Sequence, residues 1–335
     1  MSIATAIAAL QQAKEDIADA IEAKGVITTG HGLADFADDI ADIPTGGGGT
    51  DKLDLLLIPN ASGVDIDLSG LSITAIPYYA FARKSTVPGE ANGVTLINQV
   101  KLPSTLTHIY DSAFAGHARL TVYGKRLPAS LTSISASAFS YCSALELEEL
   151  PASLTSIATT AFQRCSALAL LSLPSNLTDI GSSAFSYCAA LKLRTIPAGV
   201  QVIQTSAFEY SGIEYFDIPS TCMQVNNYAF RSCNSLETLL INAATLGNGN
   251  TSVACFRSCT ALKNVWIGED CTKIFGTSSS SRPFDGCTAL TDIYCEADSK
   301  PADWSNYWNY ISASTQATVH WGVSRAEAEA IFAGE

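Results

Sequence analysis

Residues 142–162 have the sequence CSALELEELPASLTSIATTAF, and this pattern recurs along most of the chain. An Ala-Phe pair, or a close variant, returns every 22 to 33 residues, most often after 23. In most copies a cysteine follows the phenylalanine by three residues and a leucine follows it by six. A Leu-Pro or Ile-Pro pair and then a Leu-x-x-Ile segment usually precede the next phenylalanine. The recurring phenylalanines are Phe81, Phe114, Phe139, Phe162, Phe185, Phe208, Phe230, Phe256 and Phe284.

A unit of this length cannot bury its apolar face alone, so neighbouring units must stack. The apolar segment before each proline predicts a short strand, which the proline closes because it cannot donate a ladder hydrogen bond. The Ser/Thr-x-x-Ala-Phe segment predicts a short helical turn that carries the phenylalanine into the core. Rungs spaced ~4.8 Å apart would make a rod or arc roughly 40 Å long. The pattern therefore predicts an α/β repeat, a solenoid of short stacked strands and short helical turns.

The ten cysteines follow the same repeat. Six stand in one column and the others occupy leucine, alanine or strand-end positions, which is typical of small buried hydrophobic residues. Parallel Cβ directions on neighbouring rungs disfavour disulfides, and the absence of a CxxC motif disfavours a metal site. One or two bridges, or a metal, remain as alternatives. The column that we interpret as a structural ladder contains Cys142, Cys165, Cys188, Cys233, Cys259 and Cys287.

The unit Cys142-x-x-Leu145-x-x-x-x-Leu150-Pro151-x-x-Leu154-x-x-Ile157-x-x-x-Ala161-Phe162 resembles the BspA-like leucine-rich repeat of bacterial surface proteins. The resemblance covers roughly residues 51–322, and the Trp-rich segment near the C-terminus is similar to the terminal segment of such arrays. It implies a leucine-rich repeat solenoid over 51–298, a C-terminal cap over 299–335 and a role in adhesion or host attachment. Residues 242–255 carry an insertion, and His117 and Ser211 replace the column cysteine.

The segment before the repeats is different in character. Apolar residues at a 4-3 spacing predict a helix over 3–24, and a second helix is expected over 33–43. Four glycines at 46–49 then predict a flexible linker over 46–50. The block over 1–45 resembles the N-terminal block of phage and prophage tail-associated proteins, which implies an attachment module and a homo-oligomer formed through residues 3–24. An isolated helical hairpin is the alternative.

Composition excludes several function classes. The chain has 19 basic and 32 acidic residues, a net charge of −13, which argues against nucleic-acid or anionic-membrane partners. No apolar stretch reaches the ~18 residues that a membrane span needs. The first residues lack a basic n-region, so we expect no signal peptide. The four histidines lie in different modules, and no nucleophile, phosphate loop or metal motif is present. We therefore expect no enzyme activity, no catalytic residue, no metal and no cofactor.

Variable strand positions are the candidates for recognition. Counting along each strand predicts an outward row in the C-terminal half that is rich in aromatic and apolar residues, a composition suited to sugar or protein ligands. The alternative is that these residues lie under the C-terminal cap. Glu148 and Arg194 occupy expected apolar positions, so a bulge in the middle repeats could shift the faces. The candidate ligand-binding residues are Tyr215, Asp217, Leu240, Trp266 and Tyr294.

Together these features predict a non-enzymatic binding or adhesion protein. The N-terminal resemblance favours a phage virion or tail-associated protein that presents the repeats for host attachment. The alternative is a bacterial cell-surface leucine-rich repeat adhesin. In either case the expected partner is a protein or a cell-surface glycan.

Overall fold

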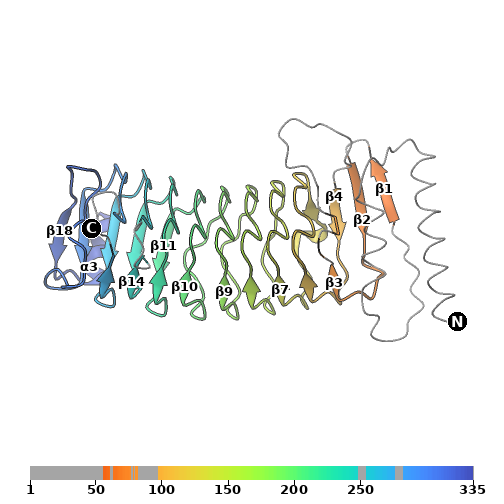
Figure 1. Ribbon diagram of the computed structural model, residues 1–335, viewed down its shortest axis with the longest axis horizontal. Coiled ribbons are helices and arrows are strands. Elements are labelled where there is room, and N and C mark those ends of the chain that lie inside the picture. Colours follow the sequence, from red (N-terminus) through yellow and green to blue (C-terminus); the bar gives the residue numbers. More distant parts are fainter. Residues whose placement is uncertain are drawn as a thin grey trace.

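The computed structural model describes residues 56–60, 63–76, 78, 80–81, 97–247, 254–275 and 282–334. Within these residues the chain forms an elongated β-solenoid, with its rungs stacked along the long axis (Figure 1). The predicted helical module over 1–45 and the linker over 46–50 lie outside the described residues, as does the proposed oligomer contact over 3–24. No helix in the described part of the chain is long and apolar enough to cross a membrane.

The strands of the solenoid form two faces. The first face begins with a four-stranded sheet in the order β1-β2-β4-β6 and resumes later as a five-stranded sheet in the order β11-β13-β15-β17-β18. All pairings are parallel except β1 with β2. The strands of this face are β1 (Leu56–Asn60), β2 (Gly63–Asp67), β4 (Ile97–Lys101), β6 (Thr121–Val122), β11 (Tyr215–Ile218), β13 (Thr238–Ile241), β15 (Asn264–Ile267), β17 (Asp292–Cys295) and β18 (Thr318–Trp321).

The second face consists of two-residue strands that come from the Leu-x-x-Ile segments. They form parallel sheets in the orders β3-β5-β7-β8-β9 and β10-β12-β14-β16. The second residue of each strand is buried, so this face closes the core along the whole stack. The strands are β3 (Ala75–Ile76), β5 (His108–Ile109), β7 (Ser133–Ile134), β8 (Ser156–Ile157), β9 (Asp179–Ile180), β10 (Val202–Ile203), β12 (Gln224–Val225), β14 (Thr245–Leu246) and β16 (Lys273–Ile274).

The first face loses its regular ladder between β6 and β11. In β11 and β17 half-buried and buried positions alternate, as a strand requires. In the rung before β8, by contrast, Leu147 and Leu150 are buried while Glu148 and Glu149 between them are exposed. Two consecutive outward residues break the period of two, so the segment forms no strand. Leu147 and its equivalents Leu170 and Leu193 in the next two rungs are all buried.

The Ala-Phe segments form tight turns, and the expectation of short helical turns is wrong. Residues two before and two after a phenylalanine adopt left-handed backbone angles, with φ of 56° at Thr160 and 61° at Arg164. A right-handed helix cannot pass through such residues. The Phe139 N–H donates to the Ala161 carbonyl of the next rung at 2.8 Å instead of to its own turn. The phenylalanine rings stack in a continuous column, 5.2–5.8 Å apart from Phe81 to Phe284, and from Phe114 onward the rings are fully buried.

One α-helix occurs in the described residues, α3 (Arg325–Ala333), beside a single 3-10 turn, η1 (Tyr123–Lys125). A capping box fixes the start of α3: the Ser324 side chain accepts from the Glu327 backbone, and the Glu327 side chain accepts from the Ser324 backbone. Gly334, at a φ of 81°, ends it with a left-handed C-cap. The helix follows β18 at the C-terminal end of the stack (Figure 1). It packs against the outer side of the last strands of the first face.

Candidate functional site

The predicted recognition residues lie on the outer side of the C-terminal sheet. Asp217, Leu240, Trp266 and Tyr294 are register partners on β11, β13, β15 and β17, so they form one row across the sheet. Tyr215 begins the neighbouring row. The sequence pattern therefore brings all five onto one face, because these strands alternate regularly.

The expectation that this face is exposed is wrong for its centre. Leu240 is 0% exposed and Trp266 is 2% exposed, because α3 lies across them. Ala328 packs against both residues, and the Phe332 and Tyr294 rings make a T-shaped contact with centroids 5.5 Å apart. The structure thus shows the alternative arrangement, in which the row lies under the C-terminal cap.

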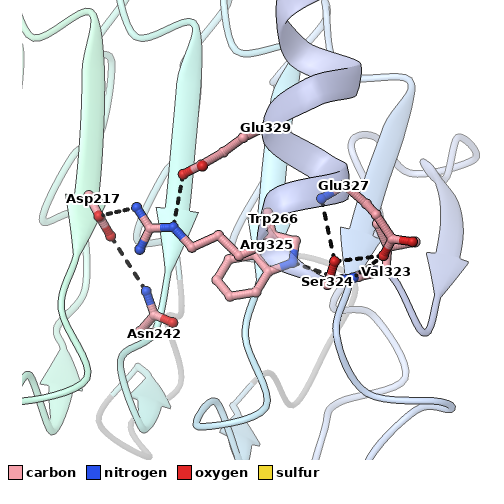
Figure 2. Close-up of polar contacts among 8 residues, drawn as sticks. All are labelled: Asp217, Asn242, Trp266, Val323, Ser324, Arg325, Glu327 and Glu329. Atoms are coloured by element: carbon pink, nitrogen blue, oxygen red, sulfur yellow. Dashed lines mark hydrogen bonds and ion pairs between the residues drawn. The ribbon is translucent and has the colours of Figure 1, made fainter. Parts of the chain in front are cut away.

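Polar contacts hold α3 on the sheet (Figure 2). Arg325 Nη2 donates to Asp217 Oδ2 at 2.7 Å, and Arg325 Nε donates to Glu329 at 2.8 Å. The Trp266 indole N–H donates to the Val323 carbonyl at 3.0 Å. Burial under the helix, and the nearby Asp217 carboxylate, raise the pKa of Tyr215. These five residues serve first to dock the cap, and any ligand on this face would have to bind beside α3.

We expect a charge placed under α3 to detach it. Ala328→Asp would put a carboxylate into a fully buried contact with Leu240 and Trp266, at a cost of about 2 kcal/mol or more in the free energy of unfolding. Trp266 would then become exposed and its emission would shift to longer wavelength. Ile331→Asp is the matched control, because Ile331 on the same helix is 45% exposed. Equal effects of the two substitutions would show that α3 does not pack as described.

The column cysteines form one buried row with a polar contact that the sequence did not predict. Each thiol donates to the carbonyl of the phenylalanine one rung earlier, for example Cys165 Sγ to Phe139 O at 3.1 Å. His117 takes the same place in its rung and bonds the Phe81 carbonyl through Nε2. The remaining thiols of the row make this contact at 3.0–3.1 Å. All ten cysteines are free and buried, and burial raises the pKa of Cys142 to about 12.

This contact predicts a difference between two small replacements of Cys165. Serine retains a donor for the Phe139 carbonyl, and Ser211 already occupies one column position, whereas alanine has no donor. Both leave a similar small cavity. We expect Cys165→Ser to be more stable than Cys165→Ala by about 1 kcal/mol, the net value of one hydrogen bond. Urea unfolding of the two variants measures this, and a more stable alanine variant would mean that the column requires only apolar volume.

A second row of side chains escaped the sequence analysis. From Phe114 to Phe284, the residues two positions after each phenylalanine all have left-handed backbone angles and form a row, in which each backbone N–H donates to the next rung. Glycine occupies this position at Gly116 and Gly286, as the backbone favours. The four rungs between Phe139 and Phe208 instead carry large side chains in the order Tyr141, Arg164, Tyr187 and Tyr210. We call these four residues the tyrosine-arginine ladder.

The ladder is a stack on the outside of the turns. The Arg164 guanidinium lies 5.1 Å from the Tyr141 ring centroid and 4.4 Å from that of Tyr187, and Tyr187 stacks on Tyr210 at 4.5 Å. Tyr141 is 52% exposed and Arg164 is also exposed. A left-handed angle costs a side-chain-bearing residue roughly 1 kcal/mol. Serine occupies the same position at Ser232 and Ser258, so the change from small residues to three tyrosines and an arginine within one repeat column is the signal that could have found the ladder.

The described residues show little that resembles a catalytic or metal centre. No group of three or more His, Cys, Asp or Glu residues in the described part of the chain is arranged to hold a metal ion. The adjacent carboxylates Glu148 and Glu149 both pair with Arg126, at 2.9 and 2.7 Å. These exposed ion pairs explain the two adjacent carboxylates without a catalytic role.

Comparison with solved structures places this arrangement among leucine-rich repeat proteins. A leucine-rich repeat protein from Bacteroides ovatus has 19% sequence identity and a TM-score of 0.51, with 82% of this chain and 76% of that chain covered. A leucine rich cell surface protein from Faecalibacterium prausnitzii has 20% identity and a TM-score of 0.30, with 85% and 98% covered. The pneumococcal vaccine antigen PcpA has 18% identity and a TM-score of 0.41, with 76% and 75% covered. No curated protein matches this chain.

The repeats themselves match a protein family. The BspA type leucine rich repeat region matches over residues 122–237 and 194–309, which together span more than half of the 335 residues. These matches begin after the N-terminal block, so they give no support to its resemblance to phage tail proteins. Because the repeat is matched over most of the solenoid, the chain belongs to the BspA type leucine-rich repeat family.

Proposed function

We propose that this chain is a non-enzymatic binding protein of the bacterial cell surface, which holds a protein or glycan ligand on the outer side of its solenoid. The observation that carries the proposal is the long row of BspA type repeats, which presents outward side chains at a regular spacing. Repeat solenoids of this kind provide extended surfaces for recognition.

Family membership favours the surface adhesin over the phage virion protein. The virion interpretation depends on the resemblance of residues 1–45, which lie outside both the family matches and the described residues. The words "cell surface" in the name of the Faecalibacterium protein describe that protein. A cell-surface location for this chain is part of the proposal.

Antibodies raised against residues 97–334 test the location. We expect them to label intact bacterial cells that produce the protein, without lysis. Labelling only after lysis would contradict the proposal, and labelling confined to phage particles would favour the virion interpretation.

A binding screen tests the function. The purified protein is applied to arrays of glycans and extracellular proteins, and bound molecules are recovered and weighed by mass spectrometry. We expect saturable binding with the ligand recovered unchanged. A ligand recovered in cleaved or modified form would show an enzyme instead.

A further inference from the structure

We propose that the tyrosine-arginine ladder is a binding site for a glycan that carries a carboxylate. The inference rests on the proposed binding function and names its ligand class. Its basis is the juxtaposition of an unpaired guanidinium with tyrosine rings on an exposed, uncharged part of a strongly acidic chain.

The Arg164 guanidinium is the first part of the site. Its Cζ lies between the Tyr141 and Tyr187 rings, 5.1 and 4.4 Å from their centroids, and it makes no ion pair with any residue that the structure describes. The guanidinium N–H groups can therefore meet a ligand. A planar guanidinium edge binds a carboxylate through two parallel hydrogen bonds.

The charge around Arg164 favours an anion. The chain has a net charge of −13, and several other exposed basic side chains are paired with acids, such as Lys125 with Glu146 at 2.5 Å. The turn positions next to Arg164 carry Ser140, Gln163 and Ser186, none of which is charged. The next acidic side chain along this row, Glu209, is already paired with Arg231 at 3.3 Å. A single carboxylate would therefore be attracted locally, whereas a long polyanion would be repelled by the rest of the surface.

The tyrosines favour a sugar over a peptide. Beyond Tyr141 the next position of the row is Gly116, which has no side chain to cover the outer face of the ring. An exposed aromatic face next to a glycine suits stacking by the C–H face of a pyranose ring. The hydroxyls of Tyr141, Tyr187 and Tyr210 have no hydrogen-bond partner among the described residues, so they can bond sugar hydroxyls. The residues that flank the ladder, including Ser143 and Ser166, are short and provide no apolar cleft for peptide side chains.

Glycine replacements test the site without disturbing the backbone. Arg164→Gly and Tyr141→Gly place at these positions the residue that Gly116 and Gly286 already provide. Arg194→Ala is the matched control, because its guanidinium also stacks on a tyrosine, Tyr215, at 4.5 Å, but lies on another face. The probes are sialyllactose against lactose, a glucuronate-terminated disaccharide against its glucose counterpart, and a short glutamate peptide.

We expect the protein to bind at least one carboxylated sugar at least tenfold more tightly than its neutral counterpart. Arg164→Gly should abolish that preference, Tyr141→Gly should weaken binding, and Arg194→Ala should have no effect. The sialyl and glucuronyl arms identify the source of the carboxylate. Equal binding of neutral and acidic sugars, a preference for the peptide, or binding unchanged by Arg164→Gly would overturn the proposal. Binding elsewhere would leave the adhesion function standing, whereas failure to bind any glycan or protein on the arrays would contradict both.

Discussion

Raising the pH from 8 to about 10.5 is expected to unfold this protein, because its core contains many buried thiols. Burial raises the pKa of Cys222 to about 11 and the pKa values of Cys142, Cys255 and Cys271 to about 12. In the unfolded chain these thiols ionise near pH 9, so above that pH the unfolded state has lost protons that the folded state retains. The free energy of unfolding therefore falls as the pH rises, by about 1.4 kcal/mol per pH unit for each thiol.

Four such thiols together remove about 5 kcal/mol per pH unit between pH 9 and 11. Typical domains have only about 5–15 kcal/mol of stability, so one to two pH units suffice for unfolding. Burial also raises the pKa values of Cys165, Cys188 and Cys295. Urea titrations at half-unit pH intervals, in the presence of a reductant, measure the slope.

Serine replacements in the column separate the thiols from the tyrosines, which also ionise near pH 10. A Cys165→Ser/Cys188→Ser variant keeps every tyrosine but lacks two of the buried thiols. Above pH 9 the free energy of unfolding of this variant should fall with pH less steeply than that of the parent. The two slopes should differ by about 3 kcal/mol per pH unit. Identical slopes in the two proteins would show that the thiols are not protected in the folded state.

The repeat made the stacking of the chain predictable, because a recurring phenylalanine every 23 or so residues can be buried only between neighbours. The turn conformation was not predictable from the same pattern. Ser, Thr and Ala around Phe162 are compatible with a helical turn, but in the structure Thr160 and Arg164 have left-handed angles and their N–H groups donate to the next rung. The thiol contacts to the phenylalanine carbonyls were missed for the same reason, since they join residues 25 to 31 positions apart.

The predicted recognition row shows how alternation can give the correct face and the wrong exposure. The strand period placed Leu240 and Trp266 outward, and they do point outward from the sheet. Whether an outward apolar row meets solvent depends on what lies over it, and here α3, from a distant part of the chain, covers it. The tyrosine-arginine ladder lies in the turns, so the alternation of the strands, which predicts outward residues, does not reveal it. The repeat column itself carries the signal, because three tyrosines and an arginine stand where the other described rungs have glycine or serine.

Removing one ring from the phenylalanine column should cause the largest loss of stability of any single substitution considered. Phe162 is fully buried, and its ring lies 5.5 Å from both Phe139 and Phe185. Phe162→Ala removes a large apolar surface, leaves a cavity and breaks two ring pairs. We expect a loss of about 4 kcal/mol or more in the free energy of unfolding. Phe162→Leu is the control, because it retains apolar volume and loses only the stacking, and it should cost less than half as much.

The column also predicts how far the damage spreads, because each rung contacts only its neighbours. Phe162→Ala combined with Phe185→Ala should be non-additive, since the two substitutions share one cavity and one ring pair at 5.5 Å. Phe162→Ala combined with Phe256→Ala should be additive, because three phenylalanines of the column, Phe185, Phe208 and Phe230, lie between them. Chemical denaturation of the single and double variants gives both coupling energies. Equal coupling in the two pairs would mean that the core responds as one globular unit, which a stack of rungs linked only through neighbouring rings does not allow.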